Sequence, residues 1–233
     1  SRKTDGNVFF KGNLITENIN KTVLPNKWNA IANPYTTNYP INKDSRTNFL
    51  QENVTKLETP AAYVWDSIQE KYIAITNLIV SNAVNIPAGK GFFIKTNSEN
   101  SVHFDKEKRT LERAFNVSSK TTNSDGFVQL IAEKNKISVN TSVIFSDNAT
   151  LNFNPKEDIQ NFDSASFDVT TKLILGENDL NYTIQSLPKS ELENSIVPIN
   201  LTSKNGDNIT FSATKNNIEK SILVYIEDKN TNK

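Results

Sequence analysis

The sequence predicts an all-β chain of two β-sandwich domains, jelly-roll or immunoglobulin-like, with one short helix. Apolar runs rich in β-branched and aromatic residues recur at roughly ten-residue intervals, without the alternating helices of an α/β protein. Turn-forming residues separate these runs, and 34 of the 233 residues are asparagine, which favours turns over helices. These observations together favour layered β-sheets.

The first half of the chain contains six predicted strands and the one predicted helix. The helix is expected over residues 45–57, where Phe49, Leu50, Val54 and Leu57 share one face and Asp44 is the expected N-cap. Each strand is a short apolar run that ends at Asn, Asp, Gly, Pro or Ser. The strands are expected over residues 8–15, 28–32, 61–65, 71–76, 91–95 and 101–104.

The second half is predicted to be strands throughout, and we place the domains at residues 1–112 and 113–233. Lys204-Asn205-Gly206-Asp207 predicts a hairpin, because Asn-Gly accepts the positive φ angles of a type I′ turn. The strands are expected over residues 111–117, 126–134, 137–145, 165–175, 180–187, 197–203, 208–213 and 221–227.

Charge and composition exclude several classes of protein. The 26 basic and 26 acidic residues cancel, so we expect no nucleic-acid partner and no attraction to an anionic membrane. Apolar runs such as Leu78-Ile79-Val80 are too short for a transmembrane segment. The chain has no Cys, and since small secreted eukaryotic domains are often rich in disulfides, a secreted chain of this kind is expected to be bacterial. With no Met and no signal peptide, we expect a fragment or a mature product.

Catalytic motifs are weak, and we expect no enzyme. His103 is the single histidine, so a Ser–His–Asp triad would have to include it, yet no Gly-x-Ser-x-Gly motif accompanies it. Residues 87–91 (P-A-G-K-G) lack the spacing of a phosphate-binding loop and precede a predicted strand. They predict a tight turn.

Two sets of residues are candidate binding sites. The carboxylates of Glu157, Asp158, Asp163 and Asp168 could hold calcium, the one cofactor that we consider, although the usual calcium-loop spacing is missing and a solvated loop is the simpler interpretation.

Tyr35 and Tyr39 lie in a loop flanked by prolines and are the predicted ligand contacts, since exposed aromatic rings can stack on sugars. Trp28 and Trp65 lie within apolar runs and are expected to fill the core.

An ordered series of motifs resembles a known group of bacterial proteins. The motifs are K-W-N-A-I-A-N-P-Y (27–35), A-A-Y-V-W-D (61–66), I-P-A-G-K-G-F-F-I-K (86–95) and V-H-F (102–104) with Arg109 behind. The series resembles the region upstream of the C-terminal sorting domain in large Bacteroidetes proteins exported by the type IX secretion system. Ala32, Thr36 and Lys90 depart from that pattern, whereas Y-T-I-Q-S-L-P (182–188) and V-Y-I-E-D-K (224–229) extend the resemblance over nearly the whole chain.

The resemblance implies a non-catalytic module of a secreted or cell-surface protein. Its implied role is adhesion, through a polysaccharide or cell-surface glycan, or that of a spacer before the sorting domain, which would contact the type IX machinery. Asp66-Ser67-Ile68 and Asp163-Ser164-Ala165 resemble the Bacteroidetes O-glycosylation signal, which makes Ser67 and Ser164 candidate acceptors. The alternatives are a polysaccharide-degrading enzyme or its accessory domain, which would need convergent carboxylates in a cleft, and a purely structural module.

Overall fold

The computed structural model describes residues 11–42, 48–79, 83–112, 125–162, 165–175, 179–204 and 206–228. Over these residues it contains fifteen strands, one short α-helix and two 3-10 turns, which confirms the predicted all-β class. No helix in these ranges is long and apolar enough to cross a membrane.

The first half is built around a four-stranded antiparallel sheet in the order β2-β7-β4-β5. Two small ribbons flank it, in which β1 pairs with β8 and β3 pairs with β6. The predicted strands over 28–32, 61–65, 71–76, 91–95 and 101–104 are confirmed to within a residue. The strands are β1 (Ile19–Thr22), β2 (Trp28–Ala32), β3 (Tyr39–Pro40), β4 (Ala61–Asp66), β5 (Lys71–Thr76), β6 (Asn85–Ile86), β7 (Gly91–Lys95) and β8 (Ser101–Phe104).

The helix is much shorter than predicted, since α1 covers only Phe49–Glu52. Asn48 caps it in a capping box with Gln51, in place of Asp44, which lies outside the described residues. Asn53 ends it, because its side-chain amide donates to the Phe49 carbonyl and to the His103 carbonyl of β8 instead of facing solvent. The predicted apolar face is buried except for Val54.

The second half forms one seven-stranded sheet in the order β14-β12-β13-β10-β9-β15, with β11 on β13. β10 and β13 run parallel, and the other pairs are antiparallel. The predicted strand over 165–175 shortens to β12, and residues 221–227 form no strand. The strands are β9 (Gly126–Lys134), β10 (Ile137–Ser146), β11 (Ile159–Gln160), β12 (Asp168–Thr171), β13 (Tyr182–Pro188), β14 (Ile199–Thr202) and β15 (Thr210–Asn216).

Three further predictions fail or lie partly outside the described residues. The predicted hairpin around Lys204–Asp207 is wrong, because β14 pairs with β12 and β15 pairs with β9 at the opposite edge of the sheet. The Asp207 carboxylate accepts from Lys134 on β9, which holds the crossing chain there. Residues 11–15 and 111–112 form no strand, and 8–10 and 113–117 lie outside the described ranges.

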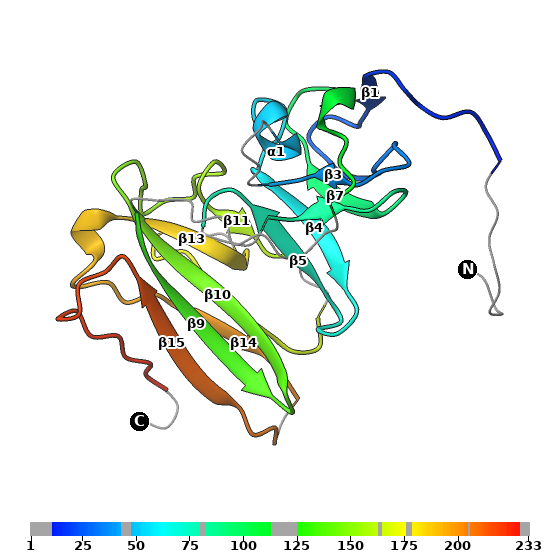
Figure 1. Ribbon diagram of the computed structural model, residues 1–233. Coiled ribbons are helices and arrows are strands. Elements are labelled where there is room, and N and C mark those ends of the chain that lie inside the picture. The colour runs from blue at the N-terminus through cyan, green and yellow to red at the C-terminus, as the bar shows by residue number, and fades with distance from the viewer. Residues whose placement is uncertain are drawn as a thin grey trace.

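The four-stranded sheet is apolar on both faces and forms the middle layer of the molecule (Figure 1). Phe92 and Ile94 of β7 face the core of the first half, and Phe93 between them faces the second half. We call this second cluster the interdomain core. Its members are Trp28, Ala61, Tyr63, Tyr72, Ala74, Leu78, Ile79 and Phe93 from the first half and Phe127, Ile144, Ile159, Phe162 and Ile184 from the second.

Several asparagines are buried and connect backbone segments. The Asn53 side chain exchanges two hydrogen bonds with the His103 backbone, at 2.7 and 2.9 Å. Asn29 does the same with Leu24, at 2.8 and 2.9 Å. An amide carries both a donor and an acceptor, so each side chain replaces one rung of a β-ladder. We call Asn29 and Asn53 the asparagine braces.

Candidate functional site

The prediction that Tyr35 and Tyr39 contact a ligand is wrong. Their side chains are buried, with 2% and 0% of the residue exposed, and their rings stack at 5.7 Å. The Tyr35 hydroxyl lies 2.8 Å from the Phe104 carbonyl oxygen, and the Tyr39 hydroxyl accepts from the Asp105 N–H at 2.8 Å. Burial raises the pKa of both phenols. Both side chains therefore stabilise the first core.

The loop that carries these tyrosines folds inward because of Asn33. The buried Asn33 amide donates to the carbonyls of Thr37 and Ile86, and its oxygen accepts from the Tyr35 N–H. Arg109 lies over the Tyr35 ring, with 5.5 Å between the guanidinium carbon and the ring centroid. Flanking prolines suggest an exposed loop, but these contacts make it part of the core.

The tryptophans divide between a buried and an exposed position. Trp28 packs in the interdomain core as predicted, whereas Trp65 at the end of β4 is 41% exposed and contacts the Tyr72 ring edge-on. Residues 87–90 form the predicted turn, in which Gly89 has φ of 68°.

His103 occupies a structural position on β8. Its Nδ1 lies 2.7 Å from Asn20 Oδ1, and its Nε2 lies 3.6 Å from Glu52 Oε1. Glu52 also binds Lys108 at 2.6 Å. The ring therefore contacts an amide and a carboxylate that is already paired, and its contacts in the described structure include no serine hydroxyl.

Three of the four predicted calcium ligands, Glu157, Asp158 and Asp168, lie within the described residues, and they do not form a group that could hold a metal ion. The Asp158 carboxylate accepts from the N–H groups of Asn154 and Ser186 at 2.7 and 2.8 Å, and Asp168 forms an ion pair with Lys71. Burial raises the pKa of Asp158 to about 6, against the lowering effect of its two hydrogen bonds. Burial also raises the pKa of Glu157.

Within the described ranges, no group of three or more His, Cys, Asp or Glu side chains could hold a metal ion. Asp163 lies outside the described residues, as does Ser164, the second predicted glycosylation site. The first, Ser67, is exposed in the turn between β4 and β5, where the Asp66 carboxylate accepts from the Ile68 N–H at 2.7 Å.

The buried ion pair between Lys71 and Asp168 was not predicted. Lys71 begins β5 and Asp168 begins β12, so the pair joins the two halves, and the two residues are only 5% and 4% exposed. Asp168 also accepts from Asn161 Nδ2 at 3.1 Å and from the Val169 N–H at 2.9 Å. The one sequence signal is that Lys71 opens an otherwise apolar strand.

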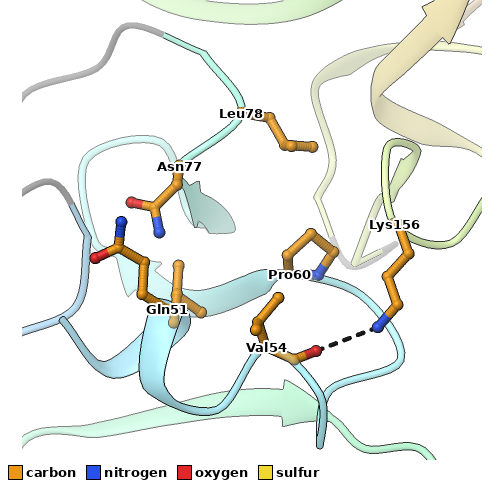
Figure 2. Close-up of a pocket in the computed structure, with 7 residues that line it drawn as sticks. Gln51, Val54, Pro60, Asn77, Leu78 and Lys156 are labelled. Atoms are coloured by element: carbon orange, nitrogen blue, oxygen red, sulfur yellow. Dashed lines mark hydrogen bonds between the residues drawn. The ribbon is translucent and has the colours of Figure 1, made fainter. Parts of the chain in front are cut away.

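The described surface includes two clefts that border the elements discussed above. The first, which we call the seam cleft, measures about 260 Å³ and lies where α1 meets the second half (Figure 2). The Lys156 side chain reaches across and donates to the Val54 carbonyl at 3.2 Å and to the Leu57 carbonyl at 3.1 Å. Its lining is mostly apolar and comprises Leu50, Gln51, Val54, Pro60, Asn77, Leu78 and Lys156.

The second, which we call the polar cleft, measures about 390 Å³. It lies on the second half, next to the buried ion pair. Its lining comprises Asn161, Ala165, Asp168, Thr170, Asn181, Asn200 and Thr202.

Comparison with known proteins gives no relative for this chain. No family model, no curated protein and no solved structure matches it.

Proposed function

We propose that this chain is a non-catalytic module of a secreted or cell-surface bacterial protein, in which it acts as a rigid spacer. The observation that carries the proposal is the interdomain core, which joins the two halves through an aromatic cluster. The motifs that resemble type IX cargo proteins support the secreted or cell-surface setting.

Phe162 is the centre of the interdomain core. It follows β11 in the second half, and its ring lies among aromatic rings of the first half. The ring centroids are 4.6 Å from Tyr72, 5.1 Å from Trp28 and 5.2 Å from Phe93. Aromatic pairs at these separations add stabilisation beyond the area that they bury.

Polar contacts between the halves surround this cluster. The Tyr63 hydroxyl donates to the Gln160 carbonyl at 2.7 Å, and Lys95 Nζ donates to Gln160 Oε1 at 3.3 Å. The buried pair of Lys71 and Asp168 adds a charged contact. Each contact has its own direction, so together they define one orientation of the halves.

This arrangement favours a fixed geometry. Domains within one chain normally move relative to each other unless their interface is large and hydrophobic. The first described residues and the last lie on opposite sides of the molecule (Figure 1). Such a module would keep the parts of a larger protein on either side of it at a constant separation.

Distance measurement between two spin labels tests the rigidity. The chain has no Cys, so Glu99→Cys and Glu193→Cys, at exposed positions in the two halves, introduce the only thiols. With spin labels on these two cysteines, we expect double electron–electron resonance to give one narrow distance distribution. Phe162→Ala in the same background should broaden it, and Leu24→Ala, at an exposed position in the first half, should not. A broad distribution in the doubly labelled parent would contradict the proposal.

A further inference from the structure

The polar cleft has the composition of a binding site for a small polar ligand. Six of its seven lining residues carry a hydroxyl, amide or carboxylate group, and only Ala165 is apolar. A surface hollow of about 390 Å³ lies at the small end of the range for ligand sites, about 300–1,000 Å³. The space suits a single ring-sized molecule.

The pairing of β12 with β14 aligns four of these side chains. Asp168 pairs with Thr202 and Thr170 pairs with Asn200 in the antiparallel ladder. Directly paired residues point to the same side of a sheet and lie next to each other. Val169, between Asp168 and Thr170, packs instead into the core of the second half. The four polar side chains therefore share the face that lines the cleft.

The charge of the cleft is balanced before any ligand binds. Asp168 is its one ionisable lining residue, and Lys71 pairs with that carboxylate from behind. A cation would have to compete with Lys71, and an anion would meet no unpaired positive charge among the lining residues. A neutral ligand fits this balance.

Thr170 carries a buried hydroxyl without a partner, which also points to a ligand in the cleft. It is 2% exposed, it lines the cleft, and its Oγ1 has no hydrogen-bond partner in the described structure. A buried hydroxyl without a partner is costly, and native structures normally satisfy such groups. This oxygen has almost no accessible surface, so a rotation of the Thr170 side chain would have to turn it toward the cleft, where a ligand hydroxyl would provide the missing partner.

We propose that the polar cleft binds a neutral polyhydroxylated ligand, namely one sugar residue, either free or at the end of a polysaccharide. Sugar hydroxyls both donate and accept hydrogen bonds, and the amide of Asn200 and the hydroxyls of Thr170 and Thr202 offer both roles. The inference does not depend on the spacer role, since a flexible module could carry the same cleft.

Binding of defined sugars to the full chain tests this inference. The probes are glucose, galactose, mannose and N-acetylglucosamine, each also as a linear tetrasaccharide, measured by calorimetry, with glucuronate and calcium as charged probes. We expect at least one neutral sugar to bind with a Kd of about 1 mM or tighter. A gain in affinity from monosaccharide to tetrasaccharide would identify a polysaccharide end as the source, and equal affinities a free sugar.

Variants connect binding to the cleft. We expect Thr170→Val to weaken binding about tenfold, as for the loss of one hydrogen bond, while its melting temperature stays equal or rises because the unsatisfied hydroxyl is gone. Thr170→Ser should restore binding. Asn200→Ala, at the half-exposed rim, should also weaken it, and the matched control Thr210→Val, exposed on β15, should not.

Three results would overturn the inference. They are no binding of any neutral sugar at about 10 mM, binding of glucuronate or calcium alone, and sugar binding that both Thr170→Val and Asn200→Ala leave unchanged.

Discussion

Replacement of Lys71 by methionine tests whether the buried ion pair holds the two halves together. Methionine has a similar length but no charge, so Asp168 would remain buried without its cation. Removal of one partner of a buried pair usually costs about 3–5 kcal/mol. Asp168 keeps its hydrogen bonds from Asn161 and from the Val169 N–H, so we expect a loss at the low end, about 3 kcal/mol of unfolding free energy.

The assay is urea denaturation at pH 7 within a double-mutant cycle. The variants are Lys71→Met, Asp168→Asn and the double variant, and Lys21→Met, exposed on β1, is the matched control. We expect a coupling energy of at least about 1 kcal/mol, because the two side chains interact directly. If Lys71→Met costs no more than Lys21→Met, or if the two substitutions are additive, the pair does not stabilise the interface as we argue.

Three other predictions concern single positions. Burial raises the pKa of Asp158 to about 6, so the folded state favours the protonated acid. The free energy of unfolding should therefore fall as pH rises from about 4 to about 6 and then level off. Asp158→Asn should flatten this pH dependence, as measured by urea denaturation at each pH. Gly126→Val should lower the melting temperature by several degrees, because a Cβ at this position would lie 2.8 Å from the Asn217 carbonyl oxygen. Overpacking of this kind costs about 1–3 kcal/mol of unfolding free energy. An unchanged melting temperature would contradict this geometry. Asn53→Leu should lower the free energy of unfolding by about 2 kcal/mol, because it removes the partner of the His103 N–H and of the His103 carbonyl. Val54→Leu, at the exposed neighbouring position, is the control in the same urea denaturation assay.

Most of the longer strands could be predicted because they depend on local sequence, whereas the short strands β1, β3, β6 and β11 were not predicted. The predicted strands over residues 71–76 and 91–95 have the bounds that the structure shows, since apolar runs between turn residues specify a strand without long-range information. Residues 221–227 show the limit of this reasoning. They alternate like a strand, but Leu223 and Tyr225 are 67% and 82% exposed, and pairing, which local sequence does not encode, is missing in the described structure.

One feature of the arrangement is encoded in the sequence but is not part of the predicted fold. The motifs A-A-Y-V-W and G-F-F-I are apolar at consecutive positions, which is typical of strands buried on both faces. They could have predicted that the four-stranded sheet is a middle layer. The alternating pattern of Ile209, Phe211 and Ala213, by contrast, is that of a strand with one exposed face.

The candidate sites depended on contacts between distant residues and could not be predicted. Tyr35 is buried because Asn33 reaches the carbonyl of Ile86, across 53 positions of sequence. Asp168 is a predicted metal ligand, and its actual partner, Lys71, lies 97 positions away. The polar cleft needs the pairing of β12 with β14, and local sequence does not encode which strands pair.

The asparagine braces are positions at which deamidation would damage the fold. The chain has neither Cys nor Met, the two side chains with the common reversible oxidations, so hydrolysis of side-chain amides is a chemical change to consider for its folding. Conversion of Asn29 or Asn53 to aspartate would keep the shape but remove the N–H donors that face the carbonyls of Leu24 and His103. Each such event would leave a buried carboxylate facing a carbonyl oxygen and would add about one dalton to the mass of the chain. We expect the deamidated molecules to have a lower free energy of unfolding than the intact chain.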